Sequence, residues 1–160
     1  MEMEKTTSLK EYFGGESTGF TPWLEKHPEI IQDILGSKNA TVYKREAKVD
    51  KFYIDLLFRD GLKTYVVENQ YGESNHDHLG KCIVYSTLIN SDKTIWIAEH
   101  FSEEYYKILK NINIDLCLAM VQLEQVDDYV AMKIYCHYKD GSTKQIIYKL
   151  NDREIIGKIQ

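Results

Sequence analysis

The stretch FYIDLLFRDGLKTYVVENQ at residues 52–70 consists of two apolar runs joined by Asp-Gly at positions 60 and 61. Asp-Gly between two such runs is the strongest short-range signal for a β-hairpin, and a two-residue turn fixes which residues face each other. With this turn, Asp55 lies diagonally across from Glu68 on one face of the ladder, and Gln70 follows on the same face. Diagonal neighbours are about 7–8 Å apart, so the two carboxylates can converge on one cation. The hairpin therefore predicts a metal site.

A chain of 160 residues with 43% apolar side chains is sufficient for one domain that buries its own core. No apolar run is long enough to cross a bilayer, and the N-terminal residues lack the basic start and the apolar stretch of a signal peptide. The three cysteines, Cys82, Cys117 and Cys136, lie far apart in apolar segments, which favours buried reduced thiols. We therefore expect a cytoplasmic protein that makes no membrane contact.

The net charge of −5 argues against a protein whose whole surface binds nucleic acid, because such proteins usually carry a basic surface. It does not exclude a local basic groove. Lys44, Arg45, Lys48 and Lys51 concentrate positive charge just before the strand that carries Asp55. A solvated strand face is the simpler explanation of this cluster, and a nucleic-acid contact is the alternative.

The N-terminal part of the chain differs in composition from the rest. Residues 1–19 are polar and contain several glycines, so we expect a flexible N-terminal arm followed by a single domain at 20–160. Thr21 and Pro22 have the form of an N-cap and a first helical residue. Pro28 is then expected to kink this helix or to divide it into two short ones.

Sequence periodicity predicts the remaining elements. The pattern becomes helical after Gly72, and the run at 94–98 is typical of a buried strand in a parallel sheet. A helix that links the antiparallel strands to such a buried parallel strand implies a crossover connection. We therefore expect an α/β fold with a mixed sheet flanked by helices and an additional C-terminal β-hairpin. The expected elements are a divided helix at 21–35, strands at 41–49, 52–59 and 63–70, a helix at 74–89, a strand at 94–98, a helix at 103–111, a strand at 116–126, a hairpin of 129–138 and 143–150, and a short polar tail.

The order of these elements, together with Asp55 and the run Glu68-Asn69-Gln70, resembles the PD-(D/E)XK nuclease superfamily, whose fold is called restriction-endonuclease-like. In that superfamily the second strand supplies an acid, and the third strand supplies an acid, any residue and a lysine. The motifs VENQ at 67–70, NHDHLG at 75–80 and FTPWL at 20–24 are similar to a little-characterised prokaryotic branch. The resemblance implies a restriction-endonuclease-like mixed sheet.

The same resemblance implies a metal-dependent nuclease that hydrolyses phosphodiester bonds, in DNA rather than RNA, and many such nucleases are homodimers. Asp55 and Glu68 would hold Mg²⁺ or Mn²⁺, with the backbone carbonyl of Asn69 as a further ligand. Such a cation activates a water molecule and neutralises charge on the phosphoryl oxygens. Gln70 would position the attacking water.

Gln70 departs from the superfamily pattern, because glutamine brings no positive charge where a lysine is usual. Lys81 lies four residues after Asp77 and four before Tyr85, so these residues share one face of the following helix. We expect Lys81 to supply the missing charge. Two interpretations stay open: an endo- or exodeoxyribonuclease, and a catalytically reduced copy that acts as a nucleic-acid-binding or regulatory module in a mobile-element or defence system.

Each candidate residue also has a simpler explanation. Asp55 and Glu68 could form a charged patch on a solvent-facing strand pair, and Lys81 could be an ordinary exposed lysine. His76 and His78 are two residues apart, so on a helix they point in different directions and are expected at the surface or in a cap. Three further acids are expected to be surface charges: Glu25, Glu29 and Glu46.

Overall fold

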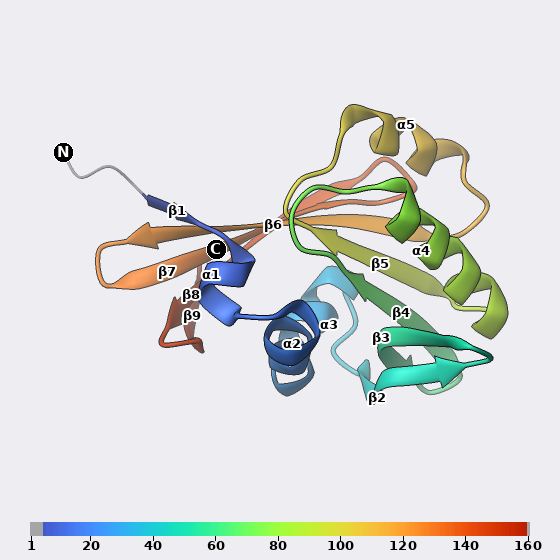
Figure 1. Cartoon of the computed structure of the whole chain (residues 1–160), viewed down its shortest axis with the longest axis horizontal. Coiled ribbons are helices and arrows are strands. Elements are labelled where there is room, and N and C mark those ends of the chain that lie inside the picture. The colour runs from blue at the N-terminus through green and yellow to red at the C-terminus, as the bar shows by residue number, and fades with distance from the viewer. Residues whose placement is uncertain (1–4, 160) are drawn as a thin grey trace.

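The computed structural model describes residues 5–159, and within this range nine strands form one sheet with helices on both faces (Figure 1). Helices α4 and α5 pack on one face of the sheet, and α1, α2 and α3 pack on the other. In chain order the elements are β1 (Lys5–Thr7), α1 (Leu9–Phe13), the π-helical turn η1 (Glu16–Phe20), α2 (Thr21–Lys26), α3 (Glu29–Leu35), β2 (Thr41–Val49), β3 (Phe52–Asp60), β4 (Lys63–Asn69), α4 (His76–Ile89), β5 (Lys93–Ala98), α5 (Glu103–Asn111), β6 (Leu116–Val126), β7 (Tyr129–His137), β8 (Thr143–Asn151) and β9 (Glu154–Ile159).

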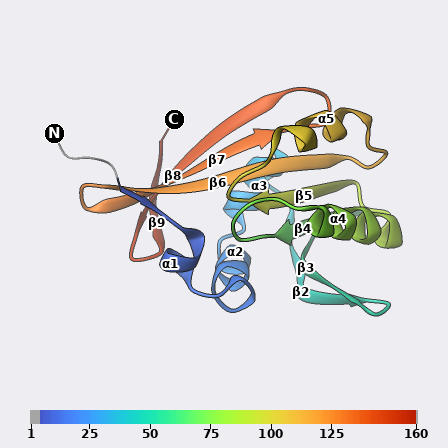
Figure 2. The same ribbon diagram turned by 45° about the horizontal axis from the view of Figure 1, so that its top comes forward.

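The sheet is mixed, with the strand order β2-β3-β4-β5-β6-β7-β8-β9. Strands β2, β3 and β4 form an antiparallel meander, and β4, β5 and β6 run parallel to one another. Helix α4 provides the crossover from β4 to β5 and lies along one face of these strands (Figure 2). The predicted mixed α/β sheet, its buried parallel strand and the C-terminal hairpin are therefore confirmed. None of the described helices is both long and apolar enough to cross a membrane.

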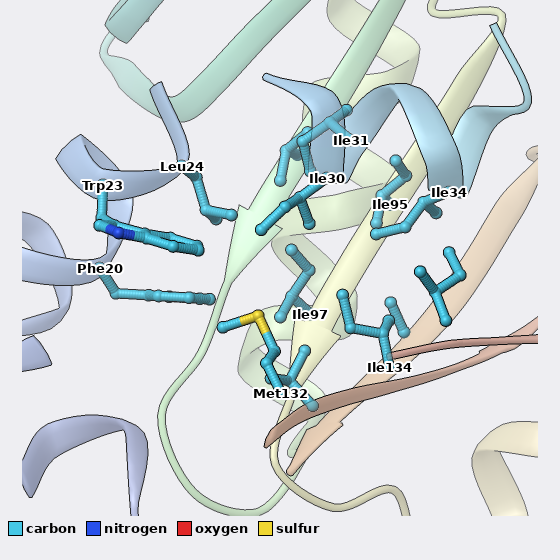
Figure 3. Packing of buried hydrophobic residues seen from close by; sticks show 14 of the residues in the cluster. Phe20, Trp23, Leu24, Ile30, Ile31, Ile34, Ile95, Ile97, Met132 and Ile134 are labelled. Carbon is cyan, nitrogen blue, oxygen red and sulfur yellow. The ribbon is translucent and has the colours of Figure 1, made fainter. Parts of the chain in front are cut away.

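A large hydrophobic cluster joins the N-terminal helices to the sheet. Figure 3 shows Phe20, Trp23 and Ile31 from η1, α2 and α3 packed near Ile97 and Met132 from the sheet. Burial of one large apolar side chain contributes about 1.5–3 kcal/mol, so this layer holds α2 and α3 firmly on the strands. The two helices are separate elements with Pro28 between them, as the sequence predicts.

A second cluster lies on the other face, under α4 and α5, and is centred on Trp96 of β5. The indole is fully buried and makes edge contacts with Phe101 and Tyr105, with ring centroids 4.9 Å and 5.1 Å away. Strand β5 pairs Trp96 with Glu68 of β4, so a buried acid lies directly beside this aromatic layer.

The two ends of the chain differ from expectation. The described part of the predicted arm, residues 5–19, is packed: β1 pairs with β6, and Leu9 and Phe13 of α1 are buried in the larger cluster. The expected polar tail is also a strand, since β9 pairs with β8 along residues 154–159. The N-terminal segment has few apolar residues and is ordered by contacts with elements distant in sequence, which local periodicity cannot detect. The C-terminal segment is ordered by pairing with the strand that precedes it.

The register of the β3–β4 hairpin also differs from the prediction. Asp60 pairs with Lys63, so the turn consists of Gly61 and Leu62 rather than Asp60 and Gly61. Gly61 has a φ of 60° at the first turn position, where a glycine is favoured in one of the common two-residue hairpin turns. The pairing moves by two residues, and because side chains alternate with a period of two, the paired residues from Leu56 to Asp60 keep their predicted faces.

Candidate active site

The β3–β4 ladder ends just before Asp55. Its last pair is Leu56 with Val67, and beyond it the backbone N–H of Asn69 donates to Oδ2 of Asp55 at 2.8 Å. A side-chain carboxylate therefore replaces a main-chain acceptor at this point. The corrected register brings Asp55 beside Glu68 rather than diagonal to it.

Strand β2 is also irregular at this level. Glu46 lies between two regular pairs, opposite Asp55, and has a left-handed backbone with a φ of 51°. Ile54 and Leu57 of β3 belong to the same packed cluster, although strict alternation would place them on opposite faces. An interruption of this kind redirects the side chain at its centre, as β-bulges near active sites do. The residue at its centre is Asp55.

Glu68 is almost completely buried on the face covered by α4. Its Oε1 atom lies 3.0 Å from Nδ1 of His78, which belongs to the first turn of α4. Its Oε2 atom is buried and has no hydrogen-bond partner among the described residues. An unpartnered carboxylate oxygen in a buried position is costly unless a proton or a cation compensates it.

The pKa values of the two acids also show that their charged forms are unfavourable at this site. Burial, and after it the neighbouring charge of Glu68, raise the pKa of Asp55 to about 8. Burial also raises the pKa of Glu68 to about 7, although the positive charge of Lys81 opposes this. Both acids therefore keep a proton to a higher pH than an exposed carboxyl group does.

Asn69 and Gln70 follow Glu68 on β4. The buried Asn69 side chain donates through Nδ2 to Oγ1 of Thr21 at 2.9 Å and so links β4 to α2. Because N–H and C=O of one residue in a strand point to the same side, the carbonyl of Asn69 is directed toward β3, as is its N–H bonded to Asp55.

Gln70 does not have the environment that a water-positioning residue requires. Its Oε1 accepts from Nε1 of Trp96 at 3.0 Å, and its Nε2 donates to the backbone carbonyl of Glu73 at 2.6 Å. The side chain is almost completely buried. The carboxamide of Gln70 therefore joins β4, β5 and the loop before α4, and these contacts give no support to the predicted role in holding a water molecule.

Lys81 lies on the same helix as His78 and remains accessible. Its Nζ atom is 3.5 Å from Asp77 Oδ2, and its side chain is 41% exposed. Burial lowers the pKa of His78, and the positive charge of Lys81 lowers it further. The same charge opposes the rise in the pKa of Glu68. Lys81 and Asp77 share one face of α4, as their spacing predicts, and the electrostatic role of Lys81 stays a prediction.

Two residues that the sequence did not single out as site residues also lie at this site. His78 contacts Glu68, and Glu16 raises the pKa of both Asp55 and Glu68 through its negative charge. Glu16 belongs to η1, where its Oε2 accepts from the backbone N–H of Tyr71 at 2.8 Å. No periodicity marks η1, so only tertiary structure reveals Glu16.

The other acids considered from the sequence have different positions. Glu25 pairs with Arg45 at 3.4 Å, and Glu29 pairs with His27 at 3.5 Å. Both are partly exposed, as predicted for surface charges. Glu46 instead contributes charge to the acid pair from β2.

A cavity of about 820 Å³ lies elsewhere, between the end of α3, the start of β5 and the β7–β8 turn. Two of its lysines are used inside the protein, since Lys144 donates to the carbonyl of Asp33 and Lys139 donates to the carbonyl of Ile112. These carbonyls lie near helix C-termini, which favour cations. The cavity is separate from the acid pair.

A structural comparison supports the same fold. A solved structure described as a repair endonuclease from Pyrococcus abyssi superposes with a TM-score of 0.52 at 10% sequence identity. The chain has a restriction-endonuclease-like fold. The match covers 72% of this chain and 62% of that chain, so the chain corresponds to about three fifths of the length of the Pyrococcus protein. No family model and no curated protein matches the sequence.

Proposed function

We propose that this chain is a metal-dependent nuclease of the PD-(D/E)XK superfamily that hydrolyses phosphodiester bonds, in DNA rather than RNA. The observation that carries the proposal is the pair of carboxyl groups of the half-buried Asp55 and the buried Glu68, with the unpartnered Oε2 atom of Glu68. The fold supports it, because the pair lies on adjacent strands of a restriction-endonuclease-like sheet.

The donor set suits a hard divalent cation. Mg²⁺ and Mn²⁺ prefer carboxylate, carbonyl and water oxygens, and they need few protein ligands. Asp55 and Glu68 would hold the ion, and the carbonyl of Asn69 is directed to the same side. Within residues 5–159 no group of three or more His, Cys, Asp or Glu side chains has a metal-binding arrangement, so the protein would supply only part of the coordination sphere.

The cation would supply an activated water and neutralise charge on the phosphoryl group. Lys81 would add positive charge near Glu68 and so stabilise an anionic substrate at the site. The exposed basic residues Lys44 and Lys48 lie on the edge strand β2, which flanks the strand carrying Asp55. They could contact the phosphate backbone without making the whole surface basic.

A second candidate function is a catalytically reduced, nucleic-acid-binding or regulatory module. The anchored carboxamide of Gln70 favours it, because this strand position offers neither a positive charge nor a side chain free to orient water. In that case the acid pair would bind metal without cleavage.

The two candidates are separated by metal titration and nuclease assays on the same preparations. We would measure Mn²⁺ binding by calorimetry for the wild type, for Asp55→Asn and Glu68→Gln, and for Glu103→Gln as a control at an exposed acid of α5. Single- and double-stranded DNA and RNA would be incubated with each protein in Mg²⁺ and in Mn²⁺. Binding and cleavage that are lost only in the two site variants support the nuclease. Metal binding without cleavage supports the second candidate, and no metal binding by the wild type refutes both metal-based proposals.

A further inference from the structure

The first turn of α4 contains two histidines with different partners. His78 Nδ1 lies 3.0 Å from Oε1 of Glu68, whereas His76 Nδ1 lies 2.9 Å from the hydroxyl of Tyr105. In the HDH motif, one imidazole therefore contacts the acid pair and the other contacts α5.

The contact between His78 and Glu68 is well enclosed. The two side chains are 16% and 4% exposed, so water competes little for the hydrogen bond. The backbone of His78 is fixed as well, because its N–H donates to Oδ1 of Asn75, the N-cap of α4, at 3.0 Å. An ionised carboxylate can only accept, so the ring donates from Nδ1 when Glu68 is charged.

This hydrogen bond distinguishes the two oxygens of Glu68. Oε1 is engaged by His78, and Oε2 is buried without a hydrogen-bond partner among the described residues. A carboxylate fixed through one oxygen cannot rotate freely, so the other oxygen keeps a defined position. Groups that orient a ligating side chain in this way commonly change metal affinity by about 10- to 100-fold when they are removed.

We propose that His78 is a positioning residue that holds Oε1 of Glu68 and thereby presents Oε2, together with Asp55, to a divalent cation. This inference rests on the proposed function, because it assigns His78 a role in the same metal site. It does not make His78 a ligand. It also gives the segment NHDHLG a physical role, since Asn75 fixes the backbone of His78 and His78 fixes Glu68.

The test uses calorimetric titration of Mn²⁺ into the full chain and four variants. His78→Ala removes the donor, and His78→Asn keeps one, because Nδ2 of asparagine is as many bonds from Cα as Nδ1 of histidine. His78→Gln places the donor one bond further out. His76→Ala is the matched control, since it removes the neighbouring imidazole that does not contact Glu68. Thermal unfolding in EDTA shows that each variant is folded.

We expect His78→Ala and His78→Gln to weaken Mn²⁺ binding by about tenfold or more, and His78→Asn to recover most of the affinity. His76→Ala should bind as the wild type does. Equal affinity in His78→Ala and the wild type overturns the inference, and so does equally weak binding by His78→Asn and His78→Ala. If His78→Ala does not fold, the comparison of His78→Asn with His78→Gln decides the question.

A metal-free crystal structure of His78→Ala separates failure of this inference from failure of the proposed function. The inference expects the carboxylate of Glu68 to leave its wild-type position. If Glu68 stays in place, the positioning role is refuted whatever the metal result. If Glu68 moves but the wild type binds no Mn²⁺, the nuclease proposal fails, and so does the part of this inference that concerns metal.

Discussion

Replacing Glu68 by glutamine should stabilise the metal-free protein at alkaline pH. In the folded chain, burial raises the pKa of Glu68 from 4.5 to about 7. The folded state therefore binds a proton more strongly than the unfolded chain, and stability falls as the pH rises between these two values. A difference of this size corresponds to about 3 kcal/mol of lost stability above pH 7, and to almost none well below pH 4.5. Glutamine has a similar shape and no charge, so it avoids this loss.

The assay is urea unfolding in EDTA at pH 5 and pH 8 for the wild type, Glu68→Gln and the control Glu103→Gln. We expect Glu68→Gln to exceed the wild type by about 2–3 kcal/mol at pH 8, and by about 1 kcal/mol or less at pH 5. The control should follow the wild type at both values, because Glu103 is exposed. The reasoning is refuted if Glu68→Gln is no more stable than the wild type at pH 8.

A divalent cation should cancel most of this difference between Glu68→Gln and the wild type. At a Mn²⁺ concentration one hundred times the dissociation constant, binding stabilises the folded state by about 2.7 kcal/mol. Only the protein with both carboxylates should gain this amount. Glu68→Gln would then be more stable than the wild type in EDTA and would gain less stability from Mn²⁺. A simple packing defect cannot produce this combination.

Three further predictions concern residues around the pair. Lys81→Met should abolish or strongly reduce DNA cleavage while Mn²⁺ binding persists, and an unchanged cleavage rate would exclude its electrostatic role. Gln70→Ala should lower the free energy of unfolding by about 1–3 kcal/mol, because the indole N–H of Trp96 loses its buried acceptor; Mn²⁺ affinity measured by calorimetry should not change, and a large loss would restore a direct role for Gln70. Gly19→Ala should be destabilising by about 1–3 kcal/mol in urea unfolding, since its Cβ would lie 2.0 Å from the carbonyl oxygen of Phe13; an unchanged unfolding midpoint would show that η1 can move away.

In the β3–β4 hairpin, the sequence predicts the face of the two acids but not the pairing of the strands. Alternation with a period of two places Asp55 and Glu68 on one face whether the turn begins at Asp60 or at Gly61, so the face could be predicted reliably. The exact pairing of residues could not be predicted, because it depends on which two residues adopt the turn conformation. The interruption at Glu46 is likewise invisible in the sequence, since glutamate has no preference for a left-handed backbone.

The partners of buried polar groups were the least predictable part of the site. The reasoning that His76 and His78 point in different directions is correct, but it does not say that one of them points at Glu68. The motif position of Gln70 predicts a role in holding water, whereas Trp96, which fixes its amide, lies 26 residues further along the chain. Hydrogen bonds between side chains distant in sequence are set by tertiary packing, and a single sequence contains no direct signal for them.

Several unfavourable features of the metal-free protein coincide at the ends of β3 and β4. The ladder stops at Leu56, Glu46 has a left-handed backbone, and the half-buried Asp55 lies beside the buried Glu68. A strained backbone residue of this kind costs about 1–3 kcal/mol. By contrast, β6 and β7 pair along nine residue pairs without interruption. Departures from regular geometry that gather at one point are expected where function requires them. The irregular geometry therefore favours the acid pair, rather than the cavity beside the end of α3, as the candidate site.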